Sequence, residues 1–178
     1  MELIGEKPLV LIGMMGAGKT TIGRRLANRL GKKFIDSDNE IELAAGMNIV
    51  DFFAKHGEAE FRKGEAKVIS RILEQENIVL GTGGGAFINQ QIRDLIKEKT
   101  ISIWIKADFD LLFARISKRA TRPLLQTKNP KQTLKKLIDE RYPIYEKADI
   151  TLVSRDVPHE MVVDNLINEA IKYLKNND

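Results

Sequence analysis

Residues 9–20, Leu-Val-Leu-Ile-Gly-Met-Met-Gly-Ala-Gly-Lys-Thr, are the stretch of sequence that decides the fold. The run Leu9–Ile12 is short and wholly apolar and ends at Gly13, which predicts a strand buried on both faces of a parallel sheet. From Lys19 onward, apolar residues recur at helical spacing until Gly31, a residue that favours helix ends. The order strand, glycine-rich loop, helix is therefore predicted.

The loop of this unit matches the pattern G-x-x-x-x-G-K-[ST], known as the P-loop, in the required place between a strand and a helix. Its glycines allow backbone N–H groups to point inward at phosphates, and the helix start adds a positive dipole end. Lys19 is expected to reach the β- and γ-phosphates of ATP, and the Thr20 hydroxyl to coordinate Mg²⁺. Thr21 joins the ATP-binding set, although support of the helix start is its simpler role. The predicted ATP-binding residues here are Gly13, Met14, Met15, Gly16, Ala17, Gly18, Lys19, Thr20 and Thr21.

The rest of the chain repeats this alternation. Helical patterns separate further strand candidates at residues 34–35, 78–80, 101–105 and 150–153, and an apolar helical stripe follows Pro158. Alternation of this kind predicts an α/β protein with a five-stranded parallel sheet between two helical layers, the three-layer α/β/α P-loop NTPase fold. Two segments do not follow this alternation of strands and helices. They are a helical insertion at residues 39–76, broken by Gly46 and Gly57, and residues 121–131.

Composition excludes several classes of protein. The 178 residues suit one domain, contain no cysteine for disulfides or thiolate metal sites, and have two distant histidines, His56 and His159. No apolar run approaches a membrane span, and the N-terminus lacks the layout of a signal peptide. A cytoplasmic location is expected.

Basic residues are concentrated in residues 111–138, which hold eight lysines and arginines and no acidic residue, whereas the whole chain has a net charge of +4. We predict a flap over nucleotide phosphates here. A nucleic-acid surface is a weaker alternative because residues 114–143 contain no aromatic residue for base stacking apart from Tyr142. For most individual lysines, a solvated surface is the simplest interpretation.

Two carboxylates, Asp36 and Asp38, follow the second strand, at the sheet edge where open α/β folds bind ligands. As alternate residues of an extended segment they would point to one side, so that Asp36 holds the Mg²⁺ shell through water and Asp38 engages an acceptor hydroxyl. The alternative is that Asp38 caps a helix starting near Asn39.

Five short motifs, in addition to the P-loop, make the chain resemble the shikimate kinases, small-metabolite kinases related to the nucleoside monophosphate kinases. In order, the motifs are Asp36-Ser37-Asp38, Gly57-Glu58-Ala59-Glu60-Phe61-Arg62, Gly83-Gly84-Gly85, Arg122-Pro123-Leu124-Leu125 and Arg141-Tyr142-Pro143-Ile144-Tyr145. The resemblance covers almost the whole chain. It implies a kinase domain over residues 1–178, with a substrate-binding region at 39–76 and a lid at 115–131.

The resemblance also implies roles for individual residues. It places Asp38, Arg62, Arg141 and the loop Gly83, Gly84 and Gly85 around shikimate, whose carboxylate suits two arginine forks and whose hydroxyls suit a carboxylate and backbone N–H groups. On the nucleotide side it makes Arg122 the lid residue over the phosphates, sets Arg115 against adenine, and adds Arg155 by a looser match. Plainer interpretations are a flexible turn for the three glycines and an exposed ion pair with Glu65 for Arg62.

The implied reaction is transfer of the ATP γ-phosphoryl group to the 3-hydroxyl of shikimate, a step of aromatic amino-acid biosynthesis, with Lys19, Asp38 and Arg122 as catalytic residues. A monomer acting on small molecules, without nucleic acid or membrane partners, is expected. Three alternatives stay open: another polyol-acid kinase such as gluconate kinase, a nucleotide-binding sensor without transfer, and nucleic-acid binding.

Overall fold

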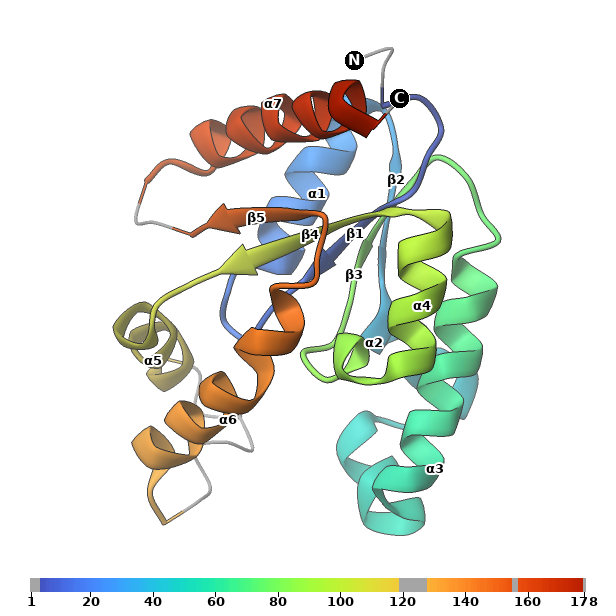
Figure 1. Cartoon of the computed structure of the whole chain (residues 1–178). Helices are drawn as coiled ribbons and strands as arrows, with labels where there is room; N and C mark the ends of the chain where they lie inside the picture. Colours follow the sequence, from blue (N-terminus) through green and yellow to red (C-terminus); the bar gives the residue numbers. More distant parts are fainter. Residues whose placement is uncertain (1–3, 119–127, 155–156, 178) are drawn as a thin grey trace.

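Five parallel strands form one sheet in the order β2-β3-β1-β4-β5 (Figure 1). The computed structural model describes residues 4–118, 128–154 and 157–177. All five predicted strands are confirmed, with the bounds Leu9–Ile12 for β1, Lys33–Asp36 for β2, Ile78–Gly81 for β3, Ile101–Lys106 for β4 and Ile150–Val153 for β5. Because β1 lies between β3 and β4, the loops that follow these three strands meet at one edge of the sheet.

Burial of the strands explains their sequence patterns. Every residue of β1 and β3 is buried, as the continuous apolar run Leu9–Ile12 predicts for a central strand covered on both faces. In contrast, β5 lies at the sheet edge and alternates buried with exposed residues. The hydrophobic core therefore centres on β1, β3 and β4, directly behind the glycine-rich loop.

Helices cover both faces of the sheet, which confirms the three-layer α/β/α class. Figure 1 shows α1 and α7 together on one face, α3 and α4 together on the other, and α5 and α6 beyond the strand ends. The helices are α1 Lys19–Leu30, α2 Ser37–Ala45, α3 Ile49–Ile72, α4 Gln90–Lys99, α5 Phe109–Ser117, α6 Pro130–Tyr145 and α7 His159–Asn177, with a short 3-10 turn, η1, at Ala86–Ile88. Gly31 ends α1 in the left-handed conformation, as its position predicts.

The helical insertion consists of α2 and α3, and both predicted glycine breaks are present. Gly46 ends α2 with φ 65°, and Gly57 bends α3 with φ 78° and ψ 173°. The expected start of the insertion at Asn39 is wrong by two residues, because α2 begins at Ser37 with Asp36 as its N-cap. None of the helices within the described ranges is both long and apolar enough to cross a membrane.

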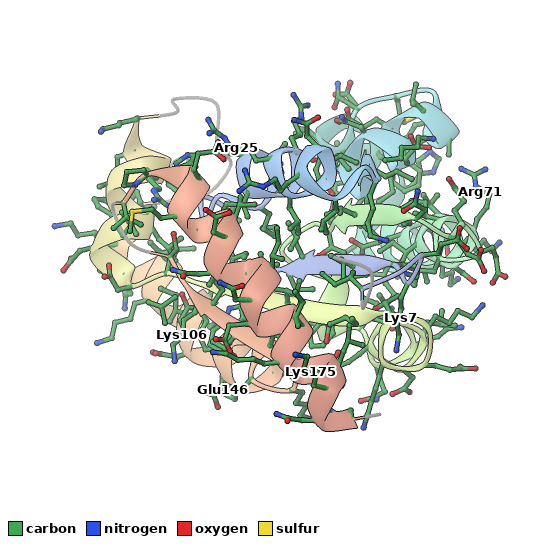
Figure 2. All side chains as sticks on the ribbon, turned by 90° about the horizontal axis from the view of Figure 1, so that it is seen from above. Lys7, Arg25, Arg71, Lys106, Glu146 and Lys175 are labelled. Atoms are coloured by element: carbon green, nitrogen blue, oxygen red, sulfur yellow. The ribbon has the colours of Figure 1, made fainter. Side chains whose placement is uncertain are left out.

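The C-terminal helix is joined to the helix of the glycine-rich loop by surface ion pairs. Arg25 of α1 pairs with Glu160 at 2.8 Å, and Arg29 pairs with Asp164 at 2.7 Å. Viewed from above in Figure 2, the labelled Arg25 lies beside the first turns of α7. Exposed pairs of this kind contribute little stability individually, so the packing of α7 depends mainly on its buried apolar face.

The predicted lid at residues 115–131 overlaps regular helices at both ends. Arg115 lies in the last turn of α5, and α6 begins at Pro130, a residue favoured in the first helical turn. The lid over residues 115–131 therefore stays a prediction. Residues 119–127, including Arg122, lie outside the described part of the chain.

Candidate active site

The glycine-rich loop turns sharply from β1 into α1. Gly13 has φ 142°, and a Cβ atom at this position would lie 2.7 Å from the carbonyl oxygen of Ile105 in β4, so only glycine fits. Gly18 has φ 102° and caps α1 without a side-chain hydrogen bond. This leaves the N-terminal N–H groups of α1 directed at the loop's hollow, the arrangement that favours bound phosphate.

Lys19 and Thr20 place a cation and a hydroxyl at this hollow. The Lys19 ammonium donates hydrogen bonds to the carbonyl oxygens of Gly13 at 2.7 Å and Met14 at 2.9 Å, which keeps the amine over the loop. The Thr20 hydroxyl donates to Oδ2 of Asp36 at 3.1 Å. A hydroxyl and a carboxylate oxygen thus meet beside the phosphate loop, and Mg²⁺ prefers oxygen ligands of these two kinds.

The segment Asp36-Ser37-Asp38 differs from its prediction. It is not extended throughout, because only Asp36 belongs to β2 whereas Ser37 and Asp38 form the first turn of α2. The helix-cap alternative also named the wrong residue, since Asp36 accepts the N–H of Asp38 at 3.1 Å and caps the helix. Asp36 therefore serves both the cap and Thr20, and the Asp38 carboxylate is left for a different set of neighbours.

A cavity of about 520 Å³ joins the two halves of the site. Its lining includes the phosphate loop, Asp36, Asp38, Gly83, Gly84, Arg115, Ser154 and His159. The Arg115 guanidinium donates to the carbonyl oxygen of Ala17 at 3.3 Å and to the Ser154 hydroxyl at 3.2 Å. The cavity therefore provides a continuous space from the acidic residues after β2 to the start of α7.

The three glycines after β3 are the common neighbour of the predicted substrate-binding side chains. A Cβ atom at Gly83 would lie 2.6 Å from Oδ1 of Asp38, one at Gly84 3.3 Å from Nη1 of Arg141, and one at Gly85 2.6 Å from Nη1 of Arg62. The fold thus brings together residues from α2, α3, α6 and the loop after β3. A carboxylate, two guanidiniums and bare backbone thus lie along three consecutive residues, a set suited to a small molecule that carries both a carboxylate and hydroxyls.

Arg62 is held by a buried partner and not by an exposed one alone. Its Nη1 atom donates to Glu65 at 2.7 Å, and Glu65 is only 1% exposed, while a second contact to the exposed Glu58 measures 3.3 Å. Gly64, between Arg62 and Glu65, does not interrupt α3. The interpretation of Arg62 and Glu65 as an exposed ion pair is therefore incomplete. The buried Glu65 carboxylate holds the Arg62 guanidinium next to Gly85.

Burial raises the pKa of Glu65, and the Arg62 guanidinium only partly offsets this effect. At mildly acidic pH, Glu65 should gain a proton earlier than an ordinary glutamate and release its ionic hold on Arg62. We therefore expect the KM for the acceptor to rise as the pH falls, and Glu65→Gln to have a high KM that depends less on pH. Glu60→Gln, which removes an exposed partner of Lys63 on the same helix, is the control. Identical acid profiles for Glu65→Gln and the unmodified protein would contradict this role.

Gly85→Ala tests whether the glycine loop must stay bare. Gly85 has φ −93° and ψ −14°, which alanine adopts freely, so the new methyl group acts only by displacing the Arg62 guanidinium. We expect the acceptor KM to rise roughly 10- to 100-fold, the value of a lost charge-assisted hydrogen bond, with little change in thermal stability. Gly64→Ala is the matched control because nothing lies within 4 Å of its new methyl group. Equal kinetics for the two variants would contradict the assignment.

Several residues of the site carried no role in the sequence prediction. The buried Ser37 hydroxyl accepts the N–H of Gly83 at 3.1 Å, and Ser154 follows β5 at the edge where all the other loops meet. The position of Ser154 after a parallel strand was a usable signal, whereas Ser37 looked like a spacer between two aspartates. Arg122 and Arg155 lie outside the described residues, so their predicted nucleotide contacts stay predictions.

Comparisons with known proteins show which family the chain resembles. A family model described as Shikimate kinase matches residues 15–171. The chain is 56% identical over 171 residues to a shikimate kinase of Rhodopseudomonas palustris, covering 96% of this chain and 84% of that relative. It is 52% identical over 174 residues to the shikimate kinase of Bradyrhizobium diazoefficiens, covering 98% and 84% of the two chains.

Two solved structures resemble this chain to different degrees. A shikimate kinase from Acinetobacter baumannii in complex with shikimate superposes with a TM-score of 0.90 at 34% identity, covering 96% of each chain. A gluconokinase from Sinorhizobium meliloti reaches a TM-score of 0.63 at 17% identity, covering 96% and 93% of the two chains, and this likeness shows the fold alone. With its family model, its relatives and its fold in agreement, the chain belongs to the shikimate kinase family.

Proposed function

We propose that this protein transfers the γ-phosphoryl group of ATP to the 3-hydroxyl of shikimate, giving shikimate 3-phosphate and ADP. The observation that carries the proposal is the convergence of Asp38, Arg62 and Arg141 on the glycine loop, beside a phosphate loop that shares one cavity with it. The relative whose solved structure holds shikimate has the same fold over nearly its whole length.

In this proposal the acceptor site positions shikimate by charge and shape. Arg62 and Arg141 bind its carboxylate, and Asp38 accepts a hydrogen bond from the hydroxyl that attacks phosphorus. The attacking oxygen forms a bond to the γ-phosphorus, the bond from that phosphorus to the bridging oxygen of ADP breaks, and the hydroxyl proton passes to Asp38. Because the protein forms no covalent bond to the substrates in this reaction, correct positioning of the two substrates supplies much of the rate enhancement.

The nucleotide side neutralises the charge of the transferring group. Lys19 exchanges its hydrogen bonds to the loop carbonyls for the β- and γ-phosphate oxygens, and Arg115, which lines the same cavity, is assigned to the adenine. Thr20 and, through water, Asp36 would hold Mg²⁺, which would offset the negative charge of the phosphates. The 3.1 Å contact between Thr20 and Asp36 supports this assignment of the two residues.

Three further expectations from the sequence belong to the proposal. The chain forms one kinase domain over residues 1–178, acts as a monomer, and works in the cytoplasm within aromatic amino-acid biosynthesis. The helices α2 and α3 serve as its substrate-binding region, and this role rests on Asp38 and Arg62, which these helices carry.

A coupled ADP-release assay with Mg²⁺ and ATP tests the proposed reaction. We expect turnover that depends on shikimate and far slower ADP release with gluconate or nucleoside monophosphates. Gluconate-dependent turnover would favour the polyol-acid alternative, and the absence of turnover with every acceptor would favour a nucleotide sensor. Phosphorus NMR of the product distinguishes a phosphate ester of shikimate from free phosphate released by hydrolysis.

A further inference from the structure

Tyr145 is a buried residue of α6 that the proposed reaction has not used. It follows Arg141 by one helical turn, so the two side chains leave the same face of α6. Tyr145 is wholly buried, and its hydroxyl donates a hydrogen bond to the carbonyl oxygen of Gly84. One helix therefore presents both the guanidinium of the acceptor site and an anchor for the glycine loop.

Gly84 lies between two parts of the active site. A Cβ atom at this position would lie 3.3 Å from Nη1 of Arg141 and 3.6 Å from both the carbonyl oxygen of Gly13 and the N–H nitrogen of Met15. The peptide that Tyr145 holds is thus packed between the phosphate loop and the acceptor's arginine.

Backbone N–H groups of the loop divide into two kinds. The N–H of Gly83 donates to Ser37, and that of Ala86 donates to the carbonyl oxygen of Gly83. The N–H groups of Gly84 and Gly85 have no partner within the described residues. They are therefore the donors that the loop can offer to a bound molecule.

Peptide geometry connects these free donors to Tyr145. The carbonyl group of Gly84 and the N–H group of Gly85 belong to one planar trans peptide and point in opposite directions. When Tyr145 fixes the Gly84 carbonyl, the direction of the Gly85 N–H is fixed as well, at a residue that the Arg62 guanidinium borders. Glycines on both sides of the peptide would otherwise allow it to rotate readily.

Tyr145 is suited to a permanent anchoring role. Burial raises the pKa of Tyr145 to about 12, so its hydroxyl remains a donor across the working range of an enzyme. The Met14 sulfur of the phosphate loop lies 3.9 Å from this hydroxyl and 4.0 Å from Nη1 of Arg141. The phenol therefore has one strong acceptor, the Gly84 carbonyl, and two further neighbours, the Met14 sulfur and the hydrogen-bonded guanidinium of Arg141.

We propose that Tyr145 is a positioning residue for the acceptor: by holding the Gly84 carbonyl, it aims the Gly85 N–H group at the carboxylate or hydroxyl of the substrate that Arg62 and Arg141 bind. This inference rests on the proposed function for the identity of the acceptor. It assigns to the phenol a role in shikimate affinity and none in the binding of ATP.

Tyr145→Phe tests the inference, and Tyr142→Phe is its matched control. Both tyrosines lie on α6, pack against Trp104 with ring centroids 5.9 and 4.9 Å away, and donate to a backbone carbonyl, but the partner of Tyr142 is Ala107, outside the acceptor site. We expect Tyr145→Phe to raise the KM for shikimate roughly tenfold with the KM for ATP unchanged, and Tyr142→Phe to change neither.

A second measurement is independent of turnover. Trp104 is the only tryptophan of the chain and contacts both tyrosine rings, so its fluorescence during a shikimate titration should give a Kd for each variant. Neither Kd nor KM depends on the fraction of folded protein, so lost stability does not obscure the result. Equal shikimate constants for the two variants, or a parallel rise in the KM for ATP, would overturn the inference. If the unmodified protein shows no shikimate-dependent turnover, the proposed function fails instead.

Discussion

Lys19→Met should lower kcat about a thousandfold, the cost of losing a preorganised charge aimed at the transferring phosphoryl group. Methionine keeps the length of the side chain and removes the ammonium, which the structure holds over the glycine-rich loop through the carbonyl oxygens of Gly13 and Met14. Steady-state ADP release measures the effect. Shikimate binding, followed by the fluorescence of Trp104, should change little because Lys19 lies on the nucleotide side.

The control for Lys19 is another lysine that donates to backbone carbonyls. Lys32 is buried and bonds to the carbonyl oxygens of Gly5 at 2.7 Å and Lys7 at 3.2 Å, and it does not line the cavity. Lys32→Met should lower thermal stability and leave kcat and the KM for ATP nearly unchanged. If Lys19→Met likewise lost only stability, Lys19 would be a structural lysine and the phosphate role would be wrong.

Asp38→Asn should lower kcat about a hundredfold or more, the usual contribution of a positioned general base. Asparagine keeps the shape of the side chain and its place beside Gly83, so the KM for shikimate should rise less than kcat falls. The same coupled assay, run with saturating ATP and varied shikimate, separates the two constants. A loss of kcat below tenfold would indicate that the carboxylate aligns the hydroxyl without accepting its proton.

Asp51→Asn provides the comparison for Asp38. Each aspartate lies in the first turn of a helix of the insertion, but Asp51 is exposed and interacts with Asn48. Its replacement should leave both kinetic constants unchanged. A similar loss of kcat in both variants would indicate that the helix starts, and not the Asp38 carboxylate, control the rate.

The phosphate loop and the sheet could be predicted because their signals are local. A buried parallel strand must be apolar throughout, and the turn after β1 must be glycine where a side chain would meet the Ile105 carbonyl. Such requirements leave a pattern in consecutive residues. The positions of Arg62, Arg141 and the glycine loop followed from the family resemblance, and the structure brings them together, while their roles with substrate stay predictions.

The direction of the Asp38 side chain could not be predicted in the same way. Side chains alternate along a strand but advance around a helix, so a helix that starts at Ser37 instead of Asn39 changes which way Asp38 points. A boundary shift of two residues lies within the uncertainty of any sequence pattern. The contact of Tyr145 with Gly84 is even harder to predict from the sequence, because it joins two distant segments and leaves no periodic pattern in either.

The position of α7 has a consequence for the order in which the site is completed. Val162 and His159, from the last helix, line the same cavity as the phosphate loop, which follows the first strand. During synthesis the loop therefore emerges long before the wall that encloses it, and no nascent chain has a finished nucleotide cavity until α7 has docked on α1. Because contacts between residues far apart in the sequence form more slowly than local helices, we expect this cavity to be completed late in folding.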